Sequence, residues 1–91
     1  MKFFDTHTRT TVDRPLVAVT LANGQKGVFV HNEISCINAF NFEDKILSQQ
    51  SIAGVVYGRD VSLEEAVANY NESVYPKKRI VTFSILEEVT S

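Results

Sequence analysis

The sequence predicts a small α+β domain: one two-layer unit in which a mixed, mostly antiparallel sheet of about four to five strands carries two helices on one face. The chain has 91 residues, a length typical of one domain, so residues 1–91 are expected to form a single unit. An Asn-Gly dipeptide between two alternating apolar runs indicates a hairpin. A Ser-x-x-Glu capping box before an apolar stripe indicates an amphipathic helix.

The first third of the chain is typical of strands. The threonine-rich segment 3–12 fits an edge strand that Pro15 stops. In the hairpin at 16–31, a two-residue Asn-Gly loop would pair Ala22 with Gln25 and so set the register. On that register the core face is purely apolar, formed by Val17, Val19, Leu21, Val28 and Val30.

The middle of the chain is predicted as a short helix between two ambiguous segments. Residues 33–40 fit either a strand or a loop. Asn41 is a favourable N-cap for a helix at 42–50 that would turn Phe42, Ile46 and Leu47 inward. Residues 51–58 fit a strand that ends at Gly58, although their length also suits a continued helix.

A second helix begins after Ser62. The Ser62 hydroxyl and the Glu65 carboxylate are placed to satisfy free amides at the helix start. An apolar stripe follows at i, i+3, i+4 and i+7, formed by Leu63, Ala66, Val67 and Tyr70. Pro76 ends the helix, and 79–86 form the last strand. With both helices on one side, the other sheet face would be partly bare and open to a homodimer contact or a partner.

Composition restricts the functional classes. The chain is 44% hydrophobic and 22% charged, as in an ordinary globular protein, and no apolar run approaches the roughly 20 residues of a membrane helix. A single cysteine, Cys36, and a start that is not typical of a secretory signal fit the cytoplasm. The net charge is −2, and residues 33–76 alone carry seven acids and two cations.

Three consecutive cations, Lys77, Lys78 and Arg79, precede the last apolar strand. Because side chains alternate along a strand, at most two of them could face one phosphate backbone, so direct nucleic-acid binding is not expected. The better interpretation is gatekeeping: together with Glu87 and Glu88 after the strand, these charges oppose aggregation of an uncharged, β-prone segment.

The chain offers little that resembles catalytic or metal chemistry. Asp5, His7, His31 and Cys36 are too few good ligands for a structural zinc site. Cys36 alone is more often a small buried hydrophobe than an activated thiolate. The sequence therefore predicts no enzyme, with no catalytic residue, metal or cofactor.

What remains is the acidic outer surface of the two expected helices. The residues predicted to bind a partner there are Glu43, Asp44, Glu64, Glu65, Asn69 and Glu72. Such a surface suits a basic patch on another protein, so the leading hypothesis is a non-enzymatic interaction module that acts as a regulator or inhibitor. In size and acidity the chain resembles small phage-encoded inhibitors, which implies competition with nucleic acid for that patch.

An alternative is a small-ligand or anion-binding regulatory domain. It would use the strand–turn–helix at 57–65, where the free amides of the helix start are aimed at a ligand that Tyr57, Arg59 and Ser62 would also bind. Asp60, Glu64 and Glu65 place negative charge around the same point, which weighs against this reading.

Overall fold

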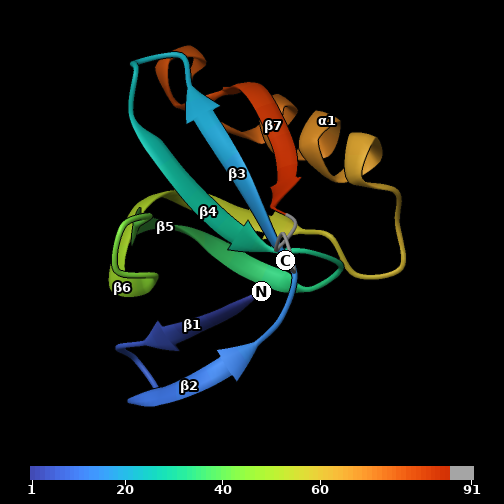
Figure 1. Cartoon of the computed structure of the whole chain (residues 1–91). Coiled ribbons are helices and arrows are strands. Elements are labelled where there is room, and N and C mark those ends of the chain that lie inside the picture. Colours follow the sequence, from blue (N-terminus) through green and yellow to red (C-terminus); the bar gives the residue numbers. More distant parts are fainter. Residues whose placement is uncertain (87–91) are drawn as a thin grey trace.

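The computed structural model describes residues 1–86. They form seven strands, one α-helix and a short 3₁₀ turn (Figure 1). The elements in chain order are β1 (Lys2–Asp5), β2 (Thr10–Asp13), β3 (Leu16–Leu21), β4 (Lys26–Val30), β5 (Ile34–Asn41), β6 (Ile46–Tyr57), α1 (Leu63–Ser73), η1 (Pro76–Lys78) and β7 (Ile80–Leu86).

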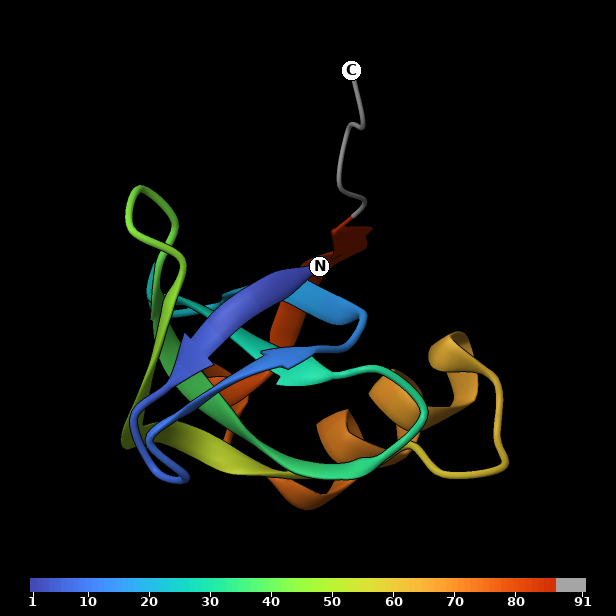
Figure 2. The same ribbon diagram turned by 60° about the horizontal axis from the view of Figure 1, so that its bottom comes forward.

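All seven strands belong to one mixed sheet, in the order β2-β1-β6-β5-β4-β3-β7. Only β1 and β6 pair in parallel; the other neighbours are antiparallel. The sheet curls strongly, and α1 lies against one side of it (Figures 1 and 2). The expected sheet of four to five strands with two helices is therefore wrong, although the α+β class holds.

The N-terminal segment is a hairpin and not a single edge strand. β1 and β2 are joined by a turn in which the Asp5 carboxylate accepts a hydrogen bond from the backbone N–H of His7, at 2.9 Å. Arg9 adopts a positive φ of 57°, which closes the reversal. The hairpin places Phe3 in the core and leaves β2 as one edge of the sheet.

The β3–β4 hairpin forms where the Asn-Gly dipeptide predicted it, but its register differs by one residue. Leu21 pairs with Gln25 around a three-residue loop, and only Gly24 has a positive φ, of 90°. A type I′ turn needs positive φ at both central residues, so this loop is instead a type I turn followed by a bulge. The slip turns Phe29 toward Val17 and Val19 and sends Val28 to the opposite face, reversing the expected faces of β4.

The helix expected at 42–50 is absent, because this segment is a hairpin turn followed by β6. The Asn41 side chain accepts hydrogen bonds from the backbone N–H groups of Glu43 and Asp44, which are the bonds expected of an N-cap. Lys45 then takes a positive φ of 54° and reverses the chain. Of the residues expected to point inward, Leu47 is buried, Ile46 is half-buried and Phe42 is exposed. Both ambiguous segments, 33–40 and 51–58, are largely strand.

The second predicted helix is confirmed as α1. The Ser62 hydroxyl accepts a hydrogen bond from the backbone N–H of Glu65 at 3.1 Å, as an N-cap does. Ala66, Val67 and Tyr70 are buried on the predicted stripe.

Two apolar clusters fill the two sides of the curled sheet. Beneath α1 lie Val17, Val19, Leu21, Phe29, Ile37, Val56, Ala66, Val67, Tyr70 and Ile80. On the other side lie Phe3, Leu16, Val28 and Leu47. The N-terminal hairpin thus covers much of the sheet face that was expected to be bare. The expected homodimer depended on that bare face, so this expectation is corrected.

Candidate docking site along β7

The acidic residues predicted to bind a partner do not form one surface. Glu64, Glu65, Asn69 and Glu72 lie together on the exposed side of α1. Glu43 and Asp44 lie in the β5–β6 turn, which Figures 1 and 2 both place on the far side of the molecule from α1. The roles of inhibitor and regulator were inferred from a two-helix surface that the described chain does not have, so they are not carried forward.

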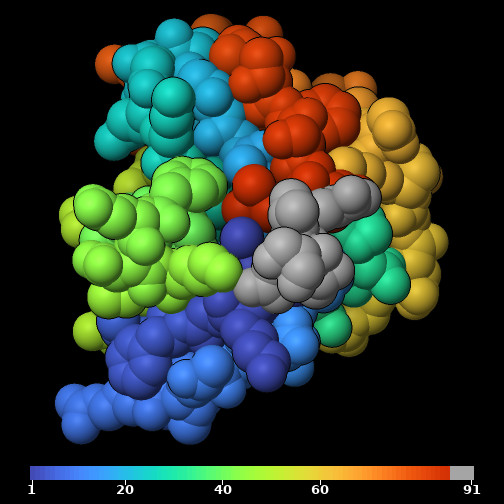
Figure 3. All heavy atoms as spheres, in the orientation of Figure 1, coloured from blue at the N-terminus to red at the C-terminus, as the bar shows by residue number. Residues whose placement is uncertain are grey.

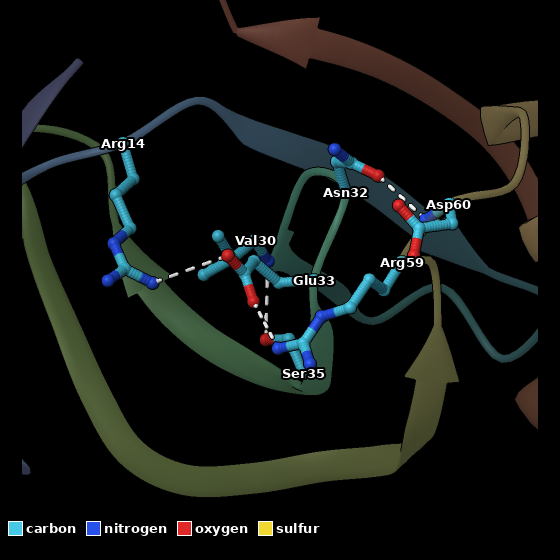
Figure 4. A network of polar contacts seen from close by, with 7 residues as sticks. All are labelled: Arg14, Val30, Asn32, Glu33, Ser35, Arg59 and Asp60. Carbon is cyan, nitrogen blue, oxygen red and sulfur yellow. Dashed lines mark hydrogen bonds and ion pairs between the residues drawn. The ribbon is translucent and has the colours of Figure 1, made fainter.

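Two of the three residues of the alternative ligand site, Arg59 and Ser62, are engaged in structural contacts, and Figure 4 shows those of Arg59. Arg59 donates to the Glu33 carboxylate at 2.9 Å, and Arg14 approaches the same carboxylate at 3.9 Å. The hydrogen bond from Arg59 lowers the pKa of Glu33; desolvation opposes this shift, and the charges of Arg59 and Arg14 add to it. Ser62 caps α1, and Tyr57 is exposed at the end of β6. The Arg59 guanidinium is thus already paired with a carboxylate where an anion would have to bind.

The basic segment before β7 fastens the chain internally. Lys77 and Lys78 belong to η1, so the strand alternation expected for these cations begins only at Ile80. The Lys78 ammonium donates to the Ile52 carbonyl at 2.9 Å, and the Arg79 guanidinium donates to the Asn71 carbonyl at 3.0 Å. Two of the three cations therefore hold backbone carbonyls, which is a structural role.

Asn71 closes the start of β7, and the sequence analysis did not identify this role. Its side-chain amide donates to the Ile80 carbonyl at 3.1 Å and accepts from the Ile80 N–H at 2.8 Å. The Asn71 side chain thus makes the two backbone hydrogen bonds to Ile80 that a neighbouring strand would otherwise make. No local pattern signals this pair, because nine residues separate the partners across a chain reversal.

Beyond Ile80, β7 is open. It is the last strand in the sheet order and pairs only with β3, so within residues 1–86 no strand lies on its outer side. All five residues from Val81 to Ile85 are exposed. Because alternate side chains of a strand point to opposite faces, both faces of this stretch are reached by solvent. Three large apolar side chains are among them, with exposed fractions of 59% for Val81, 37% for Phe83 and 42% for Ile85.

A groove of about 450 Å³ lies beside this edge. Its lining is formed by Ala18, Val19, Thr20, Lys26, Phe42, Thr82, Phe83 and Ser84. The groove is not filled by side chains because its floor consists of small residues: Ala18 and Thr20 on β3, and Thr82 and Ser84 on β7. In Figure 3 the light-green β5–β6 hairpin, which carries Phe42, lies beside β3 and the red β7.

Phe42 is held in place by an aromatic series. Its ring meets Phe40 edge-on with centroids 5.0 Å apart, and Phe40 meets the buried Phe3 at 6.3 Å. Edge-on aromatic pairs are favourable beyond their burial, so one wall of the groove is anchored to the core.

A second hollow, of about 300 Å³, brings together Asp5, His7 and Cys36. His31 does not line it. Throughout residues 1–86, no set of three or more His, Cys, Asp or Glu side chains has an arrangement that could hold a metal ion. Cys36 is a free, exposed thiol.

No helix in the described part of the chain combines the length and apolar character that crossing a membrane requires. Comparison of the chain with protein-family models, curated proteins and solved structures finds no match. The geometry of β7 and its groove is therefore the basis for a functional proposal.

Proposed function

We propose that this protein is a non-enzymatic interaction module that binds an extended segment of a partner protein along the outer edge of β7. The observation that carries the proposal is the openness of β7, an uncharged strand whose central five residues are exposed.

An open edge strand presents unpaired N–H and C=O groups in a row, which is a template for another strand. In β-strand addition, main-chain hydrogen bonds supply affinity and side-chain pockets supply specificity. β7 offers both, because the groove lies beside the same edge. Exposed large apolar side chains on that edge add surface that a partner would remove from water.

A protein is the proposed partner and nucleic acid is not, because Lys78 and Arg79 are bound to backbone carbonyls of the molecule itself. Gatekeeping by the cations before β7 is compatible with docking, since charges beside an apolar strand limit indiscriminate pairing. Glu87 and Glu88, the acidic half of the predicted gatekeeper, lie outside the described residues. The proposed location is the cytoplasm, because the Cys36 thiol is free and thiols stay reduced there.

The test is selection of binding segments from a displayed peptide library, followed by amide chemical-shift mapping. Selected peptides should perturb Val81–Leu86 and β3, and methylation of alternate peptide amides should abolish binding because it removes the main-chain donors. Val81→Lys should lower affinity at least tenfold, since it places a charge on the docking edge. Ile34→Lys is the matched control, because Ile34 is a β-branched strand residue with a similar exposed fraction of 53%. Peptides that map elsewhere, or equal loss in both variants, would exclude the proposal.

The acidic side of α1 remains a second candidate docking surface. Three glutamates, Glu64, Glu65 and Glu72, face solvent there, and no ion pair to them is found within residues 1–86. Reversal of all three charges should abolish capture of a basic partner; unchanged capture would remove this surface from consideration.

A further inference from the structure

The loop between β3 and β4 combines an exposed side-chain amide with an unshielded backbone nitrogen. Asn23 is exposed and is followed by Gly24. The nitrogen of the residue after an asparagine can close a small ring on the side-chain carbonyl carbon, and the side chain of that next residue usually hinders the attack. Glycine has no Cβ. Within the described residues, no atom beyond the chain neighbours lies within 4 Å of the place where a Gly24 Cβ would stand. The Gly24 nitrogen is therefore open to this reaction.

We propose that Asn23 is a site of spontaneous modification that converts it to aspartate and isoaspartate. The Gly24 nitrogen loses its proton and attacks the Asn23 Cγ, so that a C–N bond forms. The bond from Cγ to Nδ2 breaks, and the amide nitrogen leaves as ammonia. Water then opens the cyclic imide at either carbonyl. One opening gives aspartate, and the other gives isoaspartate, in which the main chain runs through the side-chain carboxyl carbon. Water is the only co-reactant, nothing is oxidised or reduced, and the proposal is independent of docking at β7.

The folded loop restrains this reaction through two hydrogen bonds. The Gly24 N–H donates to the Leu21 carbonyl at 2.9 Å, and the Asn23 Nδ2 group donates to Gln25 Oε1 at 2.8 Å. A hydrogen-bonded backbone amide gives up its proton only when the structure opens locally, as in amide hydrogen exchange. The rate in the folded chain should therefore follow opening of this loop, and the unfolded chain should react faster.

The products would alter the contacts that join the loop to the segment before β7. The Asn23 N–H donates to the Lys77 carbonyl at 3.0 Å, and the Lys78 ammonium donates to Gln25 Oε1 at 3.1 Å. A carboxylate at position 23 has no N–H to donate to Gln25, and it adds a negative charge near the Lys78 contact. Isoaspartate also lengthens the main chain of a loop whose length sets the β3–β4 register. Modification should therefore loosen this loop and the start of β7.

The test is peptide mapping by mass spectrometry after incubation of the full chain at mildly alkaline pH, both folded and in guanidinium chloride. Asn41 is the internal control, because it lies in an exposed turn with side-chain hydrogen bonds of its own but is followed by Phe42. We expect aspartate and isoaspartate at Asn23, formed faster in guanidinium chloride, and an unchanged Asn41 under both conditions. Absence of these products at Asn23 in guanidinium chloride, or equal conversion at Asn41, overturns the proposed site. Equal rates in the folded and unfolded chain overturn the restraint by the loop.

The variant Gln25→Ala tests the restraint directly, since it removes the Oε1 acceptor and keeps the backbone N–H. It should raise conversion in the folded chain about two- to tenfold, the range expected for loss of one hydrogen bond, and leave the rate in guanidinium chloride unchanged. Gln50→Ala is the matched control, because Gln50 is also exposed and its side chain makes no hydrogen bond to Asn23. An equal change in both variants, or no change in Gln25→Ala, overturns the role of Gln25.

The effect on the start of β7 is measured on the purified product. Amide exchange should rise at Ala22, whose N–H donates to the Arg79 carbonyl at 2.8 Å in the unmodified chain. Unchanged exchange at Ala22 would overturn the loosening, while the mapped products would still establish Asn23 as the modified residue.

Discussion

The two edges of the sheet are built in opposite ways. β2 has four residues, three of them threonine or aspartate with polar side chains at the surface, and Arg9 and Arg14 flank it. β7 has seven residues, none charged, and exposes three large apolar side chains. Short, polar, charge-flanked edges are the usual protection against unwanted strand pairing. β2 has polar side chains along its length, whereas β7 has none with a charge and is flanked by charges only in the sequence before and after it, at Lys78 and Arg79 and at Glu87 and Glu88.

The difference also shows in how each edge is fastened. At its start, β7 is held by the neutral Asn71 amide, which binds both backbone groups of Ile80. Arg14, which follows β2, approaches Glu33, and Glu33 also receives the Arg59 hydrogen bond (Figure 4). β7 is thus an apolar edge strand that is anchored at its start, while β2 is a short, polar edge strand.

The largest expected effect on stability is for a substitution in the interior of the sheet, compared with one on the β7 edge. A Cβ at Gly27 would lie 2.7 Å from the Asn38 backbone oxygen and 2.6 Å from the Ile52 side chain, so β4 and β5 would have to separate. Gly27→Ala should therefore destabilise the fold by roughly 2–3 kcal/mol in urea denaturation. Ser84→Ala on β7 is the control and should change stability by less than about 0.5 kcal/mol. Equal effects at the two positions would contradict the contrast.

The next effect concerns the anchor of β7. Asn71→Ala leaves the Ile80 N–H and carbonyl without their side-chain partner in a partly buried position, which should cost about 1–3 kcal/mol. Asn69→Ala, on the exposed side of the same helix, should be nearly neutral. Chemical denaturation of both variants measures the difference, and amide exchange should rise first at Ile80. A neutral Asn71→Ala would show that the anchor contributes no stability.

The sequence predicted features that depend on neighbours within one turn of chain. Ser62 was identified as a cap because its partner, Glu65, lies three residues away. Asn41 was misassigned because the same side-chain bonds form at a helix start and in this hairpin turn. The β3–β4 register was predicted wrongly because Asn-Gly fits both a two-residue and a three-residue loop. A difference of one residue in the loop moves each side chain of β4 to the opposite face of the sheet.

The candidate site depended on longer-range facts. The openness of β7 follows from strand order, and the groove follows from β5–β6 bringing Phe42 beside small residues of β3 and β7. Neither relation leaves a local pattern in the chain. The uncharged, β-prone composition of the last strand was visible, but the sequence could not show which of its surfaces would remain uncovered.

The smallest expected effect on stability distinguishes the Glu33–Arg59 ion pair from the Asn71–Ile80 hydrogen bonds by its dependence on pH. The folded-state pKa of Glu33 is lowered, chiefly by the Arg59 hydrogen bond, so its contribution to stability is complete above the unfolded-state pKa. That contribution is lost as pH falls through the lower folded-state pKa. Glu33→Gln should thus be slightly less stable than the unmodified chain at neutral pH, and the two should converge in acid. Both partners of Glu33 are arginines, which stay charged throughout this range, so the convergence reports the carboxylate alone.

The Asn71→Ala deficit provides the internal control for this comparison, because an amide does not titrate. Thermal unfolding of all three proteins from neutral to acidic pH should show a Glu33→Gln deficit that shrinks with acidification and an Asn71→Ala deficit that does not. Salt should reduce the Glu33 contribution as well, since this ion pair is exposed to solvent. A Glu33→Gln deficit that is independent of both pH and salt would mean that the Glu33 side chain acts through packing and not through its charge.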